Sequence, residues 1–420
     1  LFSFVNSEGL FPDVHPNERF CLLTTCGSQI NIDNFSLSFY NTNIEMLRDE
    51  ERRYTLTADQ LAKINPNTKG APTFENQRVR DIAVSIYNKF PVLINDVENT
   101  NPWGMTYHTL YHMTNDSDVF DENTKESLED DGFSLGKDGI FKKDSETYLP
   151  LYEAKYIHQF DHRYGTFEGI PKEDRFKRRA STRDLTDQQK KDVDYEIIPR
   201  YWVAEEDFRE DIENLDWDRE WVFAFRDVAR VTSDRRTAMG TITPFYPFSN
   251  KAPFVTFEDW VDAEEAVCFT TLFTSFTFDF ALRQSLSGAS INLYILKQLP
   301  MPEPAHLNKF EVEYEEGSVS LKEFLYKRGL QLMWTSHSLD PLGEELGVSS
   351  GPYEWDTHER EQLRAEIDAV IAKLYGLDRS DFEFVLDSFD ILEKQQVSRY
   401  GEYKQKMNCL NIYDDIRLRK

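Results

Sequence analysis

Short apolar-aromatic runs bounded by polar or turn-forming residues predict β-strands in two parts of the chain. Near the N-terminus, residues 2–5 and 20–25 are two such runs, with glycine and proline between them. Residues 221–228 and 237–242 form a second pair around a polar turn. Residues 121–148 are acidic and glycine-spaced, so we expect an exposed loop or hairpin there.

Apolar residues spaced three and four positions apart predict helices, which dominate the final seventy residues. Asp356 and Glu359 fit a capping box at the start of one helix, and Gly376 follows its apolar face. Residues 303–350 are predicted to be a linker plus a helix. The other helices are expected at about 56–65, 75–89, 264–283, 380–389 and 403–413. The mixture of strands and helices predicts the α+β class.

The size and composition of the chain favour a packed protein of two to three domains. It has 420 residues, of which 14% are aromatic. No window approaches 18 uncharged apolar residues, so we expect no membrane span. Four scattered cysteines fit a reducing cytoplasm, and Leu1 in place of methionine indicates the cut end of a longer polypeptide.

The formal charge of −27 disfavours a nucleic-acid binder, because phosphate contacts need lysine and arginine. Two readings reconcile this charge with DNA binding. The acid excess is a solvated surface suited to high salt, or the basic charge is local. Residues 172–191 hold eight Lys or Arg against four acids, whereas residues 205–220 hold nine acids against two Arg.

The most distinctive segment is residues 151–163, which read LYEAKYIHQFDHR. This block resembles the "LYEAKMIHQFDHR" segment found downstream of the catalytic domain in adenine-specific DNA methyltransferases of the Eco57I-like restriction-modification group. Further pieces resemble the same family in the same order: FSFVNSEGLFPDVHPNERFCLLT, LTADQLAKINPNTKGAPTF, NPWGMTYHTLYHMTNDS, RAEIDAVIAKLYGLDRSDFEFVLDSF and YGEYKQKMNCLNIYDDI. The run ending in LPMPEP resembles the closing half of target-recognition domains in specificity subunits. The resemblance therefore spans essentially the whole chain.

The resemblance implies a division into four parts. Residues 1–27 would be the last strands of a class I methyltransferase sheet, and residues 28–150 a helical and loop connector. Residues 151–302 would be a mixed α/β target-recognition domain, and residues 303–420 a helical C-terminal unit. The parent enzyme would flip an adenine and methylate it with S-adenosylmethionine. The partners implied are double-stranded DNA and a methyltransferase domain that is N-terminal to, or associated with, this chain.

The motifs that carry out methylation are missing from the chain. A class I methyltransferase needs a Gly-rich cofactor turn and an (N/D/S)PP(Y/F/W) loop whose aromatic stacks on the flipped base. The nearest imitation, Asn101-Pro102-Trp103-Gly104, lacks the second proline, and no cofactor loop precedes it. We therefore expect no catalytic residue and no cofactor in this chain.

Polar residues of the distinctive block and several arginines are the candidate DNA contacts, because such side chains reach phosphates and base edges. The alternatives are ion pairing within the fold for the block, and a solvated loop balanced by the acidic run at 205–220 for the basic window at 175–183. An Asn such as Asn292 also often caps a turn. The candidates are His158, Gln159, His162, Arg163, Arg175, Lys177, Arg178, Arg179, Arg183, Arg226, Arg230, Arg235 and Asn292.

Three weaker patterns point to other chemistry. Glu153-Ala154-Lys155 with Asp144 imitates a PD-(D/E)xK nuclease, against the alternative of a strand whose charges pair with neighbours. His108/His112 and His158/His162 have the i,i+4 spacing of zinc ligands, but lack the accompanying glutamate. Cys21 and Cys26 have no second pair to close a zinc site. We expect no metal here.

Two functions of different classes remain. The first is DNA sequence recognition by the specificity region of an adenine-N6 DNA methyltransferase, in restriction-modification or related phage defence. The second is an acidic protein-interaction scaffold in a defence complex, without direct DNA contact. A contiguous cationic surface would favour DNA, whereas a uniformly acidic surface would favour the scaffold.

Overall fold

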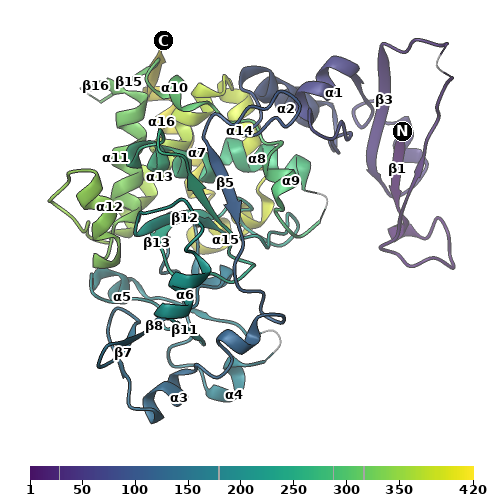
Figure 1. Cartoon of the computed structure of the whole chain (residues 1–420). Coiled ribbons are helices and arrows are strands. Elements are labelled where there is room, and N and C mark those ends of the chain that lie inside the picture. The colour runs from purple at the N-terminus through teal and green to yellow at the C-terminus, as the bar shows by residue number, and fades with distance from the viewer. Residues whose placement is uncertain (28, 178–179, 287, 316) are drawn as a thin grey trace.

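The chain folds into several small, mostly antiparallel sheets and a larger number of helices, as the computed structural model shows (Figure 1). The structure describes residues 1–27, 29–177, 180–286, 288–315 and 317–420. The predicted α+β class is confirmed. Among the described residues, no helix is both long and apolar enough to cross a bilayer.

The N-terminal residues form a four-stranded sheet in the order β2-β1-β3-β4, at one side of the molecule (Figure 1). Its strands are β1 (Phe2–Val5), β2 (Arg19–Leu22), β3 (Asn34–Asn41) and β4 (Tyr54–Thr57). The two strands predicted before residue 27 are present and antiparallel, while β1 and β3 run parallel. The sheet continues past residue 27, and its origin as a methyltransferase remnant stays a prediction.

Helices α1 (Ala58–Ile64) and α2 (Gln77–Lys89) connect this sheet to the main body, and both were predicted. Asn76 caps α2 by accepting a hydrogen bond from the backbone of Val79. The helix ends just before Pro91, as expected from the missing N–H of proline. The apolar face of α2 is buried, as its three- and four-residue spacing predicts.

The central sheet has the order β13-β12-β14-β5 and is antiparallel throughout. Its strands are β5 (Met105–His108), β12 (Trp221–Phe225), β13 (Gly240–Pro244) and β14 (Phe254–Phe257). Alternate residues of β12 enter two different cores: Phe223 and Phe225 the first, Val222 and Ala224 the second. Burial on both faces explains why β12 is a continuous apolar run.

A second antiparallel sheet is ordered β11-β8-β7-β6, and three of its strands lie in or next to residues 121–148, where an exposed loop or hairpin was predicted. Its strands are β6 (Ser134–Leu135), β7 (Phe141–Lys143), β8 (Glu146–Pro150) and β11 (Trp202–Ala204). Strands β9 (Gly165–Thr166) and β10 (Arg183–Asp184) pair nearby. Because β5 and β8 precede residue 151 but pair with later strands, both sheets cross the boundary expected at 150.

The long helix predicted at 264–283 is two helices, α7 (Ala263–Thr274) and α8 (Phe276–Ser285). Ser275 lies between them with extended backbone (ψ 154°), and its hydroxyl accepts from the N–H of Phe278. This serine caps α8, which breaks the helical path although the apolar residues continue. The prediction of one continuous helix was wrong for this reason.

The C-terminal part is mainly helical, as predicted. Its longer helices are α11 (Leu321–Met333), α12 (Asp340–Glu345), α13 (Thr357–Leu374), α14 (Arg379–Asp387), α15 (Asp390–Tyr400) and α16 (Lys404–Asp415). A small sheet of β15 (Glu311–Tyr314), β16 (Gly317–Ser320) and β17 (Arg417–Arg419) was not predicted. The short helices are α3 (Lys125–Asp130), α4 (Lys172–Arg175), α5 (Asp187–Lys191), α6 (Glu205–Asp211), α9 (Leu293–Leu296) and α10 (Pro304–Leu307).

Candidate nucleic-acid interface

The end of the distinctive block and the residue after it, residues 157–164, form a tight turn, which we call the anchored turn. The backbones of His158 and Asp161 bond to each other in both directions, at 2.8 and 3.2 Å. Phe160 adopts a left-handed conformation (φ 56°), and its N–H donates to the carbonyl of Gly240 on β13. The turn is therefore fixed to the central sheet.

Buried polar side chains hold this turn in place. Gln159 donates from Nε2 to the carbonyl of Thr274, 2.8 Å away. Asp161 forms a buried ion pair with Lys190. Burial raises the pKa of Asp161, but the charge of Lys190 outweighs this effect, so the pKa falls to about 2. Asp161 is therefore ionised in the fold.

Arg163 is completely buried and acts as a link between distant segments. Its two terminal nitrogens donate to the carbonyls of Lys190, Asp192, Tyr195 and Thr335. His162, 1% exposed, lies within 3.5 Å of Ser336, Ser338 and Glu196. We therefore revise the prediction for Gln159, His162 and Arg163: these side chains build the turn and present no donor to DNA.

His158 and Tyr164 are the partly exposed side chains of the anchored turn. Their rings stack with centroids 4.5 Å apart, and the Arg226 guanidinium lies 5.2 Å from the Tyr164 ring centre. Arg226 also donates from Nε to the carbonyl of Ile157, which fixes it beside the turn. An aromatic face with a fixed arginine is a surface on which a base or sugar-phosphate can pack.

The positive charge around His158 comes from several elements. Burial lowers the pKa of His158 well below its usual value, and the charges of Arg226 and Arg364 lower it further. The imidazole is therefore neutral near pH 7. Burial and the carboxylate of Asp184, which accepts from the Tyr164 hydroxyl at 3.0 Å, raise the pKa of Tyr164, while the charges of Arg235 and Arg226 oppose this rise. We define the cationic surface as His158, Tyr164, Arg226, Arg235 and Arg364.

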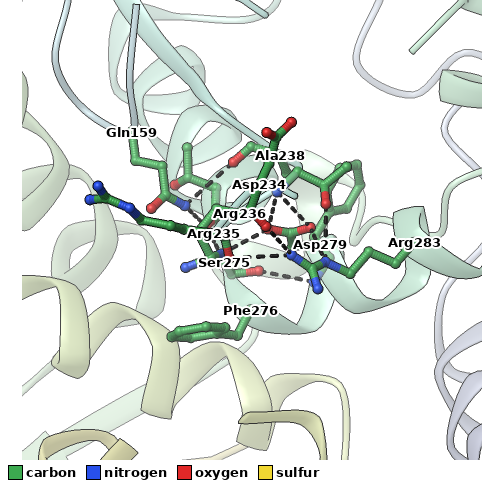
Figure 2. Close-up of polar contacts among 12 residues, drawn as sticks. Gln159, Asp234, Arg235, Arg236, Ala238, Ser275, Phe276, Asp279 and Arg283 are labelled. Atoms are coloured by element: carbon green, nitrogen blue, oxygen red, sulfur yellow. Dashed lines mark hydrogen bonds and ion pairs between the residues drawn. The ribbon is translucent and has the colours of Figure 1, made fainter. Parts of the chain in front are cut away.

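The loop at residues 228–236, here called the arginine loop, is anchored by a buried carboxylate (Figure 2). Asp279 on α8 accepts from Arg236 Nε (2.8 Å), from the backbone of Thr237 (2.9 Å) and from Arg283 Nε (3.4 Å). Burial raises the pKa of Asp279, but the charges of Arg236 and Arg283 outweigh burial and lower it. Asp279 therefore stays ionised and holds both arginines.

This anchor fixes the exposed arginines of the loop. Arg283 also donates to the backbone carbonyls of Asp234 and Arg235, at 3.4 and 3.2 Å. The backbone N–H of Arg230 donates to the Asp234 side chain at 2.6 Å. Arg230 and Arg235 are exposed. Because the loop is held at its base, their positions are defined before any ligand binds.

The described cations of the basic window are paired with nearby acids. Arg175 is 6% exposed and bonded to Glu126, and Lys177 is bonded to Asp174. Arg183 donates to the side chain of Glu168. The partners are local and do not come from the acidic run at 205–220. Arg178 and Arg179, also predicted to contact DNA, lie outside the described residues.

Trp103, Glu153 and Asn292 belong to the other candidate motifs and sites of the sequence, and the contacts of each can be compared with the role that it would need. Trp103 is 1% exposed and donates to the carbonyl of Pro302, so its ring offers no stacking face. Glu153 binds Arg200 through both carboxylate oxygens, and it precedes a 3-10 turn where a nuclease would need a strand. Asn292 is exposed at the N-cap of α9, where within the described segments its side chain makes no capping bond.

The histidine pairs do not share a helix face. His108 lies on β5, where its ring bonds to Thr256, and His158 and His162 flank a turn. Within the described residues, no group of three or more His, Cys, Asp or Glu side chains is placed to hold a metal.

Sequence reasoning missed two members of the cationic surface. Tyr164 directly follows the distinctive block, and an aromatic next to a polar block is a signal that could have identified it. Arg364 lies 200 residues further along on α13, within an ordinary amphipathic pattern, so only the fold brings it to His158.

Comparison with known proteins gives no assignment: no protein-family model matches the chain, and no curated protein matches it.

Proposed function

We propose that this chain is a DNA-binding module that contacts the duplex through the cationic surface. The observation that carries the proposal is that Arg226 is fixed beside the stacked rings of His158 and Tyr164, next to the exposed Arg235 of the arginine loop, in a chain of net charge −27. Arginines held by buried contacts can lie against phosphates or read guanine, and a neutral imidazole can donate to or accept from a base edge.

More specifically, we propose that it is the specificity region of an adenine-N6 DNA methyltransferase of restriction-modification or related phage defence. The resemblance of the block at 151–163 and of the ordered series around it supports this assignment. S-adenosylmethionine would then be bound by a separate methyltransferase domain. Residues 1–57, which contain β1–β4 and are called the N-terminal lobe, offer a surface for such a partner. Seven large apolar side chains of this lobe are 42–65% exposed: Phe11, Val14, Leu22, Leu23, Ile30, Ile32 and Ile44.

The binding experiment is fluorescence anisotropy with a labelled duplex across a salt series. About four to six phosphate contacts would lower affinity steeply between low and physiological salt. A Kd that does not change with salt would contradict the proposal.

A methylation assay tests the second part. The purified chain should transfer no labelled methyl group from S-adenosylmethionine to DNA, because it lacks the cofactor turn and the base-flipping loop. Incorporation of label by this chain alone would contradict the assignment of catalysis to a partner.

The second candidate function is the acidic protein-interaction scaffold. The exposed acids of α6 and the segment after it, together with Trp260 at 62% exposure, favour this alternative. The two functions differ in one observable: the scaffold binds no duplex at low salt, whereas the DNA-binding module does.

A further inference from the structure

A cavity of about 830 Å³ lies where the four predicted parts of the chain meet. Its walls come from β2 and β3 of the N-terminal sheet, from the start of α2, from the arginine loop with α8, and from the end of α14. This volume is within the about 300–1,000 Å³ that is usual for small-molecule sites. The cavity is separate from the cationic surface, because none of the five residues that define this surface is among the described residues that line the cavity.

Three arginines line the cavity, and two of them are exposed. Arg283 is held by Asp279, whereas Arg19 of β2 and Arg230 of the arginine loop form no ion pair within the described residues. Of the two carboxylates in the lining, Asp387 is paired with Lys406 at 2.6 Å, and Glu75 is exposed. Arg19 and Arg230 thus come from different elements of the lining, and both guanidinium groups are available to an anionic group in the cavity.

Tyr40 enters the cavity lining through an unusual backbone. It has φ 58°, a left-handed conformation that a bulky residue rarely adopts. The pairing of β1 with β3 shifts in register at this point, between Phe2–Ser38 and Phe4–Asn41. Such a bulge turns a side chain away from the regular sheet. The Tyr40 hydroxyl bonds to Thr73, another lining residue, at 2.9 Å, which holds the ring in place.

The rest of the lining suits a flat, partly apolar group. Half-buried Phe384 of α14 contributes aromatic surface alongside Tyr40, while Phe280 of α8 is completely buried behind the lining. A site that holds aromatic rings next to free arginines has the two elements that bind a nucleotide, since bases stack on rings and phosphates bind guanidinium groups. A strained residue at such a site is commonly retained for ligand contact.

We infer that this cavity binds a nucleotide, with its phosphate between Arg19 and Arg230 and its base against Tyr40. The nucleotide is either free in solution or an unpaired unit at the end of a DNA strand. This inference does not depend on duplex binding by the cationic surface. A ligand there would contact all four parts of the chain and would stabilise their arrangement.

Isothermal titration calorimetry with each of the four 2′-deoxynucleoside 5′-monophosphates tests the inference, with inorganic phosphate as a parallel titrant. We expect saturable binding of at least one nucleotide and much weaker binding of phosphate alone. Duplexes with a three-nucleotide single-stranded overhang are compared with blunt duplexes of equal length. This comparison shows whether the bound nucleotide is free or is an unpaired unit of a DNA strand. If the unit belongs to a strand, the overhang duplex binds more tightly, and if the nucleotide is free, the two duplexes bind equally.

Variants locate the site. Arg19→Ala combined with Arg230→Ala should weaken nucleotide binding at least about tenfold, because two charge-assisted contacts are lost. Arg48→Ala is the matched control, since Arg48 is an exposed arginine of the same lobe that pairs with Glu45 and does not line the cavity. It should leave the Kd unchanged.

Tyr40→Gly separates binding from folding. Glycine adopts positive φ without strain, so this variant should retain its melting temperature within a few degrees while losing about tenfold in nucleotide affinity. Three results would overturn the inference: no nucleotide binding at all, phosphate binding as tightly as nucleotide, or equal affinity in the arginine variant and the Arg48→Ala control. If the unmodified chain binds mononucleotides but no duplex, the result would instead contradict the proposal that the cationic surface binds DNA.

Discussion

The arginine loop and the basic window look alike as sequences but differ in what their arginines contact. In the basic window, Arg175, Lys177 and Arg183 each bond to a nearby carboxylate. In the arginine loop, one buried carboxylate, Asp279, holds Arg236 and Arg283, which leaves Arg230 and Arg235 exposed. The position of the acids, more than the number of arginines, therefore decides which cations stay exposed and available to a ligand.

We expect the largest loss of folding stability when Asp279, the buried anchor of the arginine loop, is replaced. Asp279→Asn keeps the size of the side chain but removes the carboxylate that pairs with Arg236 and Arg283 in a buried site. Removing one partner of a buried pair costs about 3–5 kcal/mol, so urea unfolding should show a loss of that size. The control is Asp174→Asn in the basic window, whose ion pair with Lys177 is solvent-exposed. A loss below about 1 kcal/mol in Asp279→Asn would contradict the anchoring role.

Much of the fold could be predicted from the sequence because its signals are local. The caps of α1 and α2, the apolar face of α13 and the strands β12 and β13 each follow from short-range patterns. The break at Ser275 and the sheet joining β15 to β17 depend on one cap and on a pairing across more than 100 residues. Neither leaves a periodic signal.

The candidate site could be predicted only in part. The block at 151–163 was singled out as a candidate DNA contact, but its most polar residues, such as Arg163, are buried and support the turn. Burial cannot be read from residue type when a polar side chain is fully hydrogen-bonded inside the fold. Arg364 reaches His158 only through tertiary packing.

A second buried carboxylate near the anchor, Asp368, makes the stability of this region depend on pH. Burial raises the pKa of Asp368 to about 6, with the charge of Arg236 opposing it. Asp368 therefore contributes stability while it is protonated, below about pH 4, and this contribution is lost as pH rises through 6. The difference amounts to at most about 3 kcal/mol.

Asp368→Asn tests whether stability falls, as predicted, when the pH rises through 6. Relative to the variant, the unmodified chain should lose stability between pH 4 and pH 7 in urea unfolding. The N–H of Phe276, which donates to Asp368 Oδ1 at 2.8 Å, keeps an acceptor in the variant. Parallel curves for the two proteins over this range would show that Asp368 keeps an ordinary pKa.

The smallest effect is expected in the basic window. Lys177→Ala removes an exposed ion pair with Asp174, so stability should change by about 0–1 kcal/mol. Thermal unfolding measures this change. A shift comparable to that of Asp279→Asn would remove the distinction between the two segments.

The proposal that the cationic surface, and not the basic window, contacts DNA is tested most directly by duplex affinity in two matched double variants. The affinity is measured by fluorescence anisotropy at low salt. Arg226→Ala with Arg235→Ala removes two cations of the cationic surface, and Lys177→Ala with Arg183→Ala removes two from the basic window. We predict that the first pair weakens binding at least about tenfold, since each lost arginine contact is worth about 1–3 kcal/mol, while the second pair changes the Kd less than about threefold. Equal losses in both variants, or a loss only in the second, would contradict the account.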